Sequence, residues 1–249
     1  MKLCRPAIVS CLLLSAALVH AAEVRVFVAG ASKAAFETLA HDYERTSGNT
    51  LKASFDTVGA LRDRVIAGDQ PDLVILSSAG VDALMARGLI KADARADLGL
   101  VVAGLAVRRG APVPDISTEA ALRKTLLGAE SIAQADGARG ATSGAHFSKL
   151  IDTLGLREML GPRITVLPFG VEAIQGVSDG KYALGVSQSS EIVPIAGVTF
   201  VGGLPAPYAL RTLYTAAALQ GRSEGLQLLN FLRSDGAKAH FAASGFAAP

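Results

Sequence analysis

The chain has 249 residues, of which 50% are hydrophobic, 18% charged and 5% aromatic, with a formal net charge of +2. This composition is too apolar for a disordered chain and too weakly charged for a general nucleic-acid binder, so both classes are excluded. The length suits one large domain or two small ones, each able to bury a core. Lys2 and Arg5 precede every acidic residue, and without them the basic and acidic residues are equal in number, so the body is formally neutral.

Both cysteines, Cys4 and Cys11, lie in the same opening segment. The body therefore has no disulfide, no thiolate nucleophile and no cysteine-based metal site. His41, His146 and His240 show no metal-ligand spacing, so a zinc enzyme is not expected either. We predict a protein with no metal and no cofactor.

Residues 1–21 have the pattern of a secretory signal peptide. Lys2 and Arg5 give the positive start, residues 7–19 form the apolar run, and Ala21 offers a small residue before the cut. A membrane anchor needs about 20 apolar residues, and this run is shorter. We predict cleavage near Ala21/Ala22, a periplasmic protein, and no membrane association after the signal is removed.

Apolar strand-like runs alternate with helical periodicity after the signal. Residues 24–28 predict a strand, and apolar residues at helical spacing follow it, at Phe36, Leu39, Ala40 and Tyr43. The alternation continues through predicted strands at 51–55 and 72–76 and predicted helices at 61–66 and 81–87. This rhythm is typical of a parallel sheet with helices on its faces.

A longer apolar run at 98–107 is long enough to cross into a second lobe, and a predicted helix at 120–127 follows it. A second alternating set predicts strands at 131–135, 164–167 and 183–186, and helices at 144–154 and 171–178. Residues 210–219 then return to the first lobe, and one or two helices at 224–241 close the chain.

The expected fold class is therefore α/β, with two lobes, each a mainly parallel sheet flanked by helices, and a ligand cleft between them. The expected division is a signal peptide at 1–21, lobe 1 at 22–103 plus 206–249, and lobe 2 at 104–205.

Short polar loops follow the predicted strands in both lobes. Ligands of open α/β sheets bind at the carboxyl ends of the strands. The loops combine Gly with a hydroxyl or amide side chain just before a helix, where free N–H groups favour an anion. Serine and threonine are also ordinary helix caps, so each loop alone has a purely structural interpretation. The loop residues that we single out are Ser32, Thr57, Gly59, Ser77, Ser143, Gly170 and Gln188.

Four further residues near these loops have side chains suited to chemistry on an anion. Lys33, Arg62 and Arg139 are ordinary surface charges taken singly, but together they have the chemistry to hold the carboxylates of a polyanion. If Ser143 caps its helix, His146 falls in the first turn, where the helix dipole favours a neutral ring that can act as a base. The alternative is that His146 is a polar first-turn residue facing solvent.

Several short motifs occur in the order found in the periplasmic molybdate-binding proteins of ABC transporters, which the chain resembles over essentially all of the mature region. They are Ala31-Ser32, Ser54-Phe55 leading to Leu61, Pro71-Asp72-Leu73-Val74-Ile75, Leu184-Gly185-Val186, and Phe231-Leu232-Arg233-Ser234 followed by Gly245-Phe246. The resemblance implies a two-lobe, venus-flytrap protein that closes on an oxyanion.

The chain departs from that family at the ligand positions. Ser32 stands where the family places its first ligand serine, but Gly59 stands near the second, and Gln188 replaces the ligand tyrosine. The family's small apolar position falls near Ser77 and its valine near Gly170. The tetrahedral molybdate cage is therefore not preserved, and the small residues at 59 and 170 predict a roomier pocket for an organic anion.

Two functions follow. The first is an exported solute-binding protein, expected to be monomeric, that captures a di- or tricarboxylate and delivers it to an ABC transporter permease. The alternative comes from aconitate isomerase, an exported enzyme that resembles the same family and interconverts trans- and cis-aconitate. That reaction requires a base and groups that hold carboxylates but no cofactor. On this alternative, His146 is the catalytic base.

Overall fold

The structure is a computed structural model that describes residues 21–249. The predicted signal peptide, with both cysteines, lies outside these residues except for Ala21. In the described part, no helix is long and apolar enough to cross a membrane.

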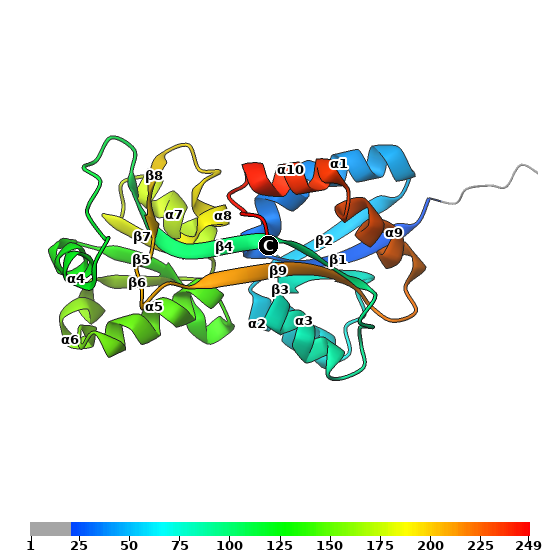
Figure 1. Ribbon diagram of the computed structural model, residues 1–249, viewed down its shortest axis with the longest axis horizontal. Helices are drawn as coiled ribbons and strands as arrows, with labels where there is room; N and C mark the ends of the chain where they lie inside the picture. Colours follow the sequence, from blue (N-terminus) through cyan, green and yellow to red (C-terminus); the bar gives the residue numbers. More distant parts are fainter. Residues whose placement is uncertain (1–20) are drawn as a thin grey trace, which may run out of the picture.

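The chain begins with three strands and three helices in alternation. The strands are β1 (Glu23–Ala29), β2 (Thr50–Asp56) and β3 (Leu73–Ser77), and β1 pairs in parallel with both of the others. The short 3-10 helix η1 (Gly30–Ser32) leads into α1 (Lys33–Ser47), and α2 (Val58–Ile66) and α3 (Ser78–Met85) follow β2 and β3. In Figure 1, α1 lies on one face of this sheet and α2 and α3 on the other.

Two long antiparallel strands, β4 (Arg95–Arg108) and β9 (Arg211–Ala218), connect the two halves of the molecule (Figure 1). β9 also pairs with β3. Residues 95–102 of β4 pair with β9, whereas residues 103–106 pair with β7 (Leu184–Gln188) and residues 104–108 with β8 (Val198–Gly203). β4 therefore changes partners near residue 103. On this ground we propose the division into lobe 1 and lobe 2 given above.

Lobe 2 repeats the strand–helix alternation around a second parallel set. Strand β5 (Ile132–Ala135) pairs in parallel with β6 (Ile164–Leu167) and with β7. The flanking helices are α4 (Glu119–Gly128), α5 (Thr142–Thr153), α6 (Arg157–Leu160), α7 (Gly170–Ser178) and α8 (Ser189–Ile192), with the 3-10 helices η2 (Gly137–Arg139) and η3 (Gly161–Arg163). The last helices, α9 (Ser223–Leu232) and α10 (Asp235–Ala243), pack on lobe 1.

The buried residues explain why these segments form these elements. β3 reads Leu-Val-Ile-Leu-Ser with all five side chains buried, as expected for a central strand covered on both faces. In α5, Phe147, Leu150 and Ile151 are buried at helical spacing. One hydrophobic core includes Phe36 and Leu61 of lobe 1, and separate clusters fill lobe 2. The expected α/β class with parallel sheets flanked by helices is confirmed.

The chain also contains elements that the periodicity did not predict. Strand β8, the single turn of α8 and helix α6 fall in segments where no regular element was expected. β8 mixes Thr, Phe, Val and two glycines, so it lacks the alternation that marks a strand. It forms because β4 offers it an edge on which to pair.

Candidate functional site

The carboxyl ends of the strands of both lobes meet at one small cavity. Residues that follow β1, β2, β5, β6 and β7 line it, together with Tyr214 of β9. The cavity has a volume of about 30 Å³, enough for about one or two water molecules. A tricarboxylate is much larger, so its entry requires the lobes to be further apart than they are here.

Five helices begin at this cavity, and the first residues of most of them lack a side-chain cap. The N-cap residues Ala29, Ala141, Phe169 and Gln188 make no side-chain cap bond to η1, α5, α7 or α8, respectively. Among the five, Thr57 alone caps its helix, accepting a bond from the Ala60 N–H at 3.2 Å. N–H groups at uncapped helix starts are free to bind an anion, and the helix dipoles favour negative charge there.

Helices that begin elsewhere are mixed, because α6 and α9 also begin without a side-chain cap whereas three others have one. Ser77, Thr118 and Ser234 each cap their own helix through the side chain. None of these three lines the cavity. The structural interpretation therefore holds for Ser77, whereas η1, α5, α7 and α8 begin next to the cavity without a side-chain bond from the N-cap residue. The Val171 N–H in the first turn of α7 bonds the Glu191 carboxylate.

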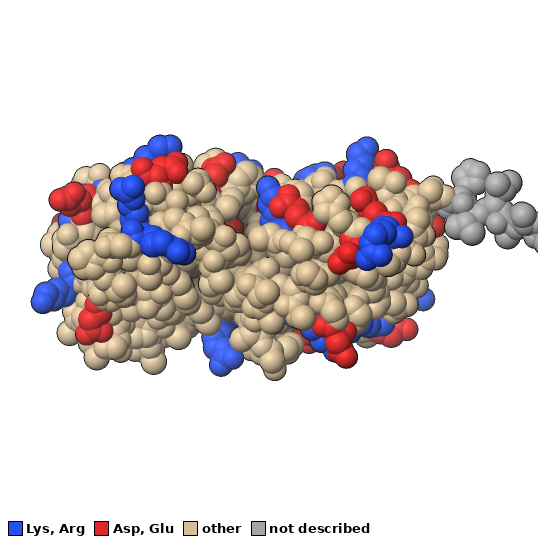
Figure 2. Space-filling model, turned by 90° about the horizontal axis from the view of Figure 1, so that it is seen from above, with Lys and Arg blue, Asp and Glu red and all other residues tan. Residues whose placement is uncertain are grey.

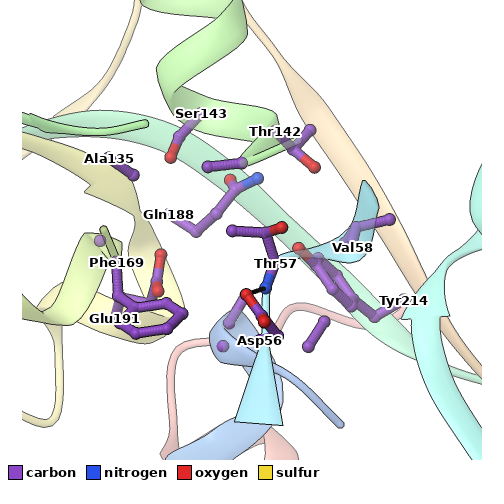
Figure 3. A pocket seen from close by; sticks show the side chains of 15 residues that line it. Asp56, Thr57, Val58, Ala135, Thr142, Ser143, Phe169, Gln188, Glu191 and Tyr214 are labelled. Atoms are coloured by element: carbon purple, nitrogen blue, oxygen red, sulfur yellow. Dashed lines mark hydrogen bonds between the residues drawn. The ribbon is translucent and has the colours of Figure 1, made fainter. Parts of the chain in front are cut away.

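Glu191 is the acidic residue that faces this site from α8. Figure 3 shows its side chain pointing into the cavity, with Gln188, Ser143 and Thr57 around the same space. Its carboxylate accepts a hydrogen bond from the Ser187 hydroxyl at 2.5 Å. Burial raises the pKa of Glu191, and the bonds from Ser187 and from backbone N–H groups only partly oppose this effect.

Two further polar side chains face the cavity from the central strands. Tyr214 is 2% exposed, and burial raises the pKa of its phenol, with the Glu191 charge adding to the effect. The Gln188 amide nitrogen donates to Thr212 at 3.3 Å, while its oxygen, Oε1, has no partner among the described residues. A buried amide oxygen without a partner is destabilising, and a ligand that donates a hydrogen bond to it would supply the missing bond.

The two lobes touch at the edge of the cavity. The Thr57 hydroxyl donates to the backbone carbonyl of Arg139, and the Gly59 N–H donates to the carbonyl of Gly140 at 3.3 Å. The Arg139 guanidinium also bonds Asp56 at 3.1 Å, in a partly exposed ion pair that bridges the lobes. These contacts hold the cleft nearly closed.

The sequence-based site residues separate into two groups. Those that line the cavity are Thr57, Ser143, Gly170 and Gln188. Those that do not are Ser32, Lys33, Gly59, Arg62, Ser77, Arg139 and His146. Lys33 is exposed and lies 3.8 Å from Glu37, and Arg62 bonds its neighbour Asp63 at 2.8 Å. Ser32 is fully buried, and its hydroxyl has no partner among the described residues.

His146 does not have the position that the sequence predicted. Helix α5 begins at Thr142 with Ala141 as its N-cap, so Ser143 is inside the helix and His146 lies beyond the first turn. Its Nε2 is 2.8 Å from the carbonyl oxygen of Tyr208. Because a carbonyl only accepts, Nε2 carries the proton in this arrangement. The expectation of a Ser143 cap with His146 in the first turn is therefore wrong.

In the closed arrangement described here, neither Gly59 nor Gly170 adds room for a ligand, for a steric reason. A Cβ at Gly59 would lie 2.8 Å from the Cα of Gly140, so the missing side chain is filled by the opposite lobe. A Cβ at Gly170 would lie 2.4 Å from Glu191 Oε2 and 2.2 Å from Ser187 Oγ. At both glycines, the space that a side chain would take is filled by other protein atoms and is not open to a ligand.

Sequence reasoning missed Asp56, Phe169, Glu191 and Tyr214 as cavity residues. Glu191 directly follows the polar loop after β7, so its position in the sequence could have indicated that it lies at the cavity. Tyr214 gave no such signal, because only the pairing of β9 with β3 and β4 brings it to the site.

Charged side chains of both signs are mixed on one face of the molecule. On the face shown in Figure 2, basic and acidic side chains are scattered over both lobes and do not gather into one basic patch. Among residues 21–249, no group of three or more His, Cys, Asp or Glu side chains is placed to hold a metal ion.

The chain matches known proteins along most of its length. Residues 24–247 match the family model described as bacterial extracellular solute-binding protein. Aconitate isomerase from Pseudomonas sp is 31% identical over 225 residues, covering 86% of this chain and 84% of that protein.

Solved structures share the fold at lower identity. The periplasmic molybdate-binding protein of Azotobacter vinelandii is 18% identical with a TM-score of 0.72, and covers 91% of this chain and 99% of its own. The periplasmic binding protein AfuA of Actinobacillus pleuropneumoniae, with bound fructose-6-phosphate, is 12% identical with a TM-score of 0.69, and covers 90% and 83%.

Proposed function

The chain belongs to the bacterial extracellular solute-binding protein family, and from this premise we propose that its cavity takes a small unsaturated polycarboxylate of the aconitate type and isomerises it. The observation that carries the proposal is the convergence of uncapped helix N-termini from both lobes on one cavity. The 31% identity to an aconitate isomerase supports the choice of substrate.

The proposed reaction is an allylic proton shift. A base removes a proton from the CH₂ next to the C=C bond, the double bond moves by one carbon, and the proton returns to the former vinyl carbon. No atom is gained or lost and no redox change occurs, so no cofactor is needed. The intermediate carries extra negative charge on a carboxylate, and the helix N–H groups are the donors that would stabilise it.

The test is direct turnover. Purified protein is incubated with trans-aconitate, and cis-aconitate is followed by proton NMR or chromatography. We expect cis-aconitate to form without added metal or cofactor. No product at high protein concentration would overturn the isomerase proposal.

A second candidate is a receptor that delivers the same class of anion to an ABC transporter permease outside the cytoplasm, as a monomer. The two strands that join the lobes favour it, because β4 and β9 provide a hinge for closure on a solute. Calorimetry with trans-aconitate, citrate and molybdate separates the solutes. Tight binding of molybdate alone would contradict the carboxylate in both candidates.

A further inference from the structure

The Glu191 carboxyl fills a space that its neighbouring residues leave open. A Cβ at Gly30 would lie 3.2 Å from Glu191 Oε1, and one at Gly170 would lie 2.4 Å from Oε2. Two glycines therefore leave the room that the carboxyl fills, and Ser187 fixes its orientation through the 2.5 Å hydrogen bond. None of the ion pairs among the described residues involves Glu191. Hydrogen bonds hold the carboxyl at the cavity, and no cation among the described residues pairs with it.

The carboxyl accepts hydrogen bonds from Ser187 and from the backbone N–H groups of Gln188 and Val171, so it also satisfies a donor in the first turn of α7. These bonds do not cancel its charge, and a carboxylate in a site for a polycarboxylate repels the ligand. A carboxyl that alternates between charged and neutral forms during a reaction has a reason to be there.

Resting on the proposed isomerisation, we propose that Glu191 is the base that removes the allylic proton and the acid that returns it. The carboxylate takes the proton from the CH₂ carbon as the C–H electron pair forms the new C=C bond. The neutral carboxyl then gives a proton to the carbon that loses its double bond, and Glu191 is regenerated as a carboxylate.

Two observations support this role. Burial raises the pKa of Glu191, and a base with a pKa closer to neutral accepts and returns a proton more readily than an ordinary carboxylate. Glu191 also lines a second pocket of about 220 Å³, which it shares with Ser190 and Lys33. The residue therefore borders both the inner cavity and this second pocket.

Other titratable groups lie near Glu191, and their charges affect how its protonation depends on pH. They are Tyr214 on β9, Asp56 at the end of β2 with its partner Arg139 in η2, Lys33 with Glu37 on α1, and Glu172 on α7.

The experiment compares wild type with Glu191→Gln and with the control Glu172→Gln, an exposed acid in the first turn of the adjacent α7. For each protein, calorimetry gives the Kd for trans-aconitate and NMR gives kcat as a function of pH. We expect Glu191→Gln to lose roughly 10²–10⁴-fold in kcat, as for a lost general base, with Kd no weaker than that of wild type. Glu172→Gln should match wild type. In wild type, kcat should fall as the pH falls through the raised pKa of Glu191.

The outcomes separate this inference from the proposed function. If wild type turns over and Glu191→Gln keeps kcat within about threefold, Glu191 is not the base and the isomerase stands. If wild type and Glu172→Gln show no turnover, both proposals fail. If Glu191→Gln does not fold, Glu191→Asp decides: reduced turnover with a shifted acid limb supports the proposal, and wild-type turnover with an unshifted limb overturns it.

Discussion

Glu191 combines two features that oppose each other in a stable protein: it can carry charge, and its carboxyl is packed among Gly30, Gly170 and Ser187. The packing disfavours the charged form, so burial raises the pKa of this group. The folded state therefore binds the Glu191 proton more tightly than the unfolded state does. This difference makes folding stability depend on pH.

The first prediction concerns that dependence. For a group whose pKa is raised by folding, the stabilising contribution is complete below the unfolded pKa and is lost as the pH rises through the folded pKa. Glu191→Gln removes the group that titrates, so we expect the free energy of unfolding of this variant, relative to that of wild type, to be higher at pH 8 than at pH 4.

The measurement is urea unfolding at pH 4 and pH 8. The free energy of unfolding of Glu191→Gln, relative to that of wild type, should be smaller at pH 4 than at pH 8. For Glu172→Gln, this difference from wild type should be the same at both pH values. If the difference in unfolding free energy between Glu191→Gln and wild type is equal at pH 4 and pH 8, the proposed effect of burial on Glu191 is contradicted.

At the scale of elements, the helices divide by what satisfies their first N–H groups. In α3, α4 and α10 these groups bond a Ser or Thr side chain, whereas α5 and α7 at the cavity, like α6 and α9 away from it, begin without a side-chain cap from the N-cap residue. A missing cap lowers helix stability by about 1 kcal/mol. The uncapped starts are therefore a local loss of stability at the place where an anion would bond the same N–H groups.

The second prediction tests this exchange between stability and affinity. Ala141 is nearly buried, with extended backbone angles suited to an N-cap. Ala141→Ser adds a hydroxyl that can bond the first N–H groups of α5, so we expect a gain of about 1 kcal/mol in unfolding free energy. If the same N–H groups bind the carboxylate, trans-aconitate should bind about fivefold more weakly.

Thr118→Ala is the matched control, because Thr118 caps α4 away from the cavity by bonding the Ala121 N–H at 3.2 Å. It should lose about 1 kcal/mol of stability and leave the calorimetric Kd unchanged. If Ala141→Ser gains stability but binds trans-aconitate as tightly as wild type, the N-terminus of α5 is not part of the anion site.

For the whole molecule, the two lobes share β4 and β9 and meet again at the cavity edge. The Gly59 and Gly140 backbones are so close that a side chain at either position would collide with the other. The cavity between them is too small for a tricarboxylate. A ligand cycle thus requires separation of the lobes and renewed closure, with contacts from both lobes stabilising the closed form.

The third prediction uses Gly59→Ala to block that closure. The nearest atoms to the added Cβ all belong to Arg139 and Gly140 of the other lobe. Lobe 1 should fold as before, with unfolding free energy within about 0.5 kcal/mol of wild type. Small-angle scattering with saturating trans-aconitate should show a larger radius of gyration, and the Kd should weaken by about tenfold, within the range of typical coupling energies. A compact liganded variant with wild-type affinity would contradict this role.

Much of the fold follows from local patterns. The buried run of β3 and the helical spacing of Phe147, Leu150 and Ile151 predicted their elements because each pattern reflects one packed face. Strand β8 escaped prediction because pairing with β4, and not its own alternation, holds it in place. Loops at the ends of the strands were also located correctly from sequence, since parallel strands end at one edge of a sheet.

The sequence by itself determined the α/β class, the formally neutral body without cysteines, and the loops from which cavity residues come. Tertiary structure alone decided which loop residues face one another. It left His146 and Arg62 outside the cavity lining, let Gly140 fill the space beside Gly59, and brought Glu191 next to Tyr214, distant in the chain. The reason is physical: periodicity records which face of an element is buried, but lobe closure and strand pairing set the distances between side chains from different elements.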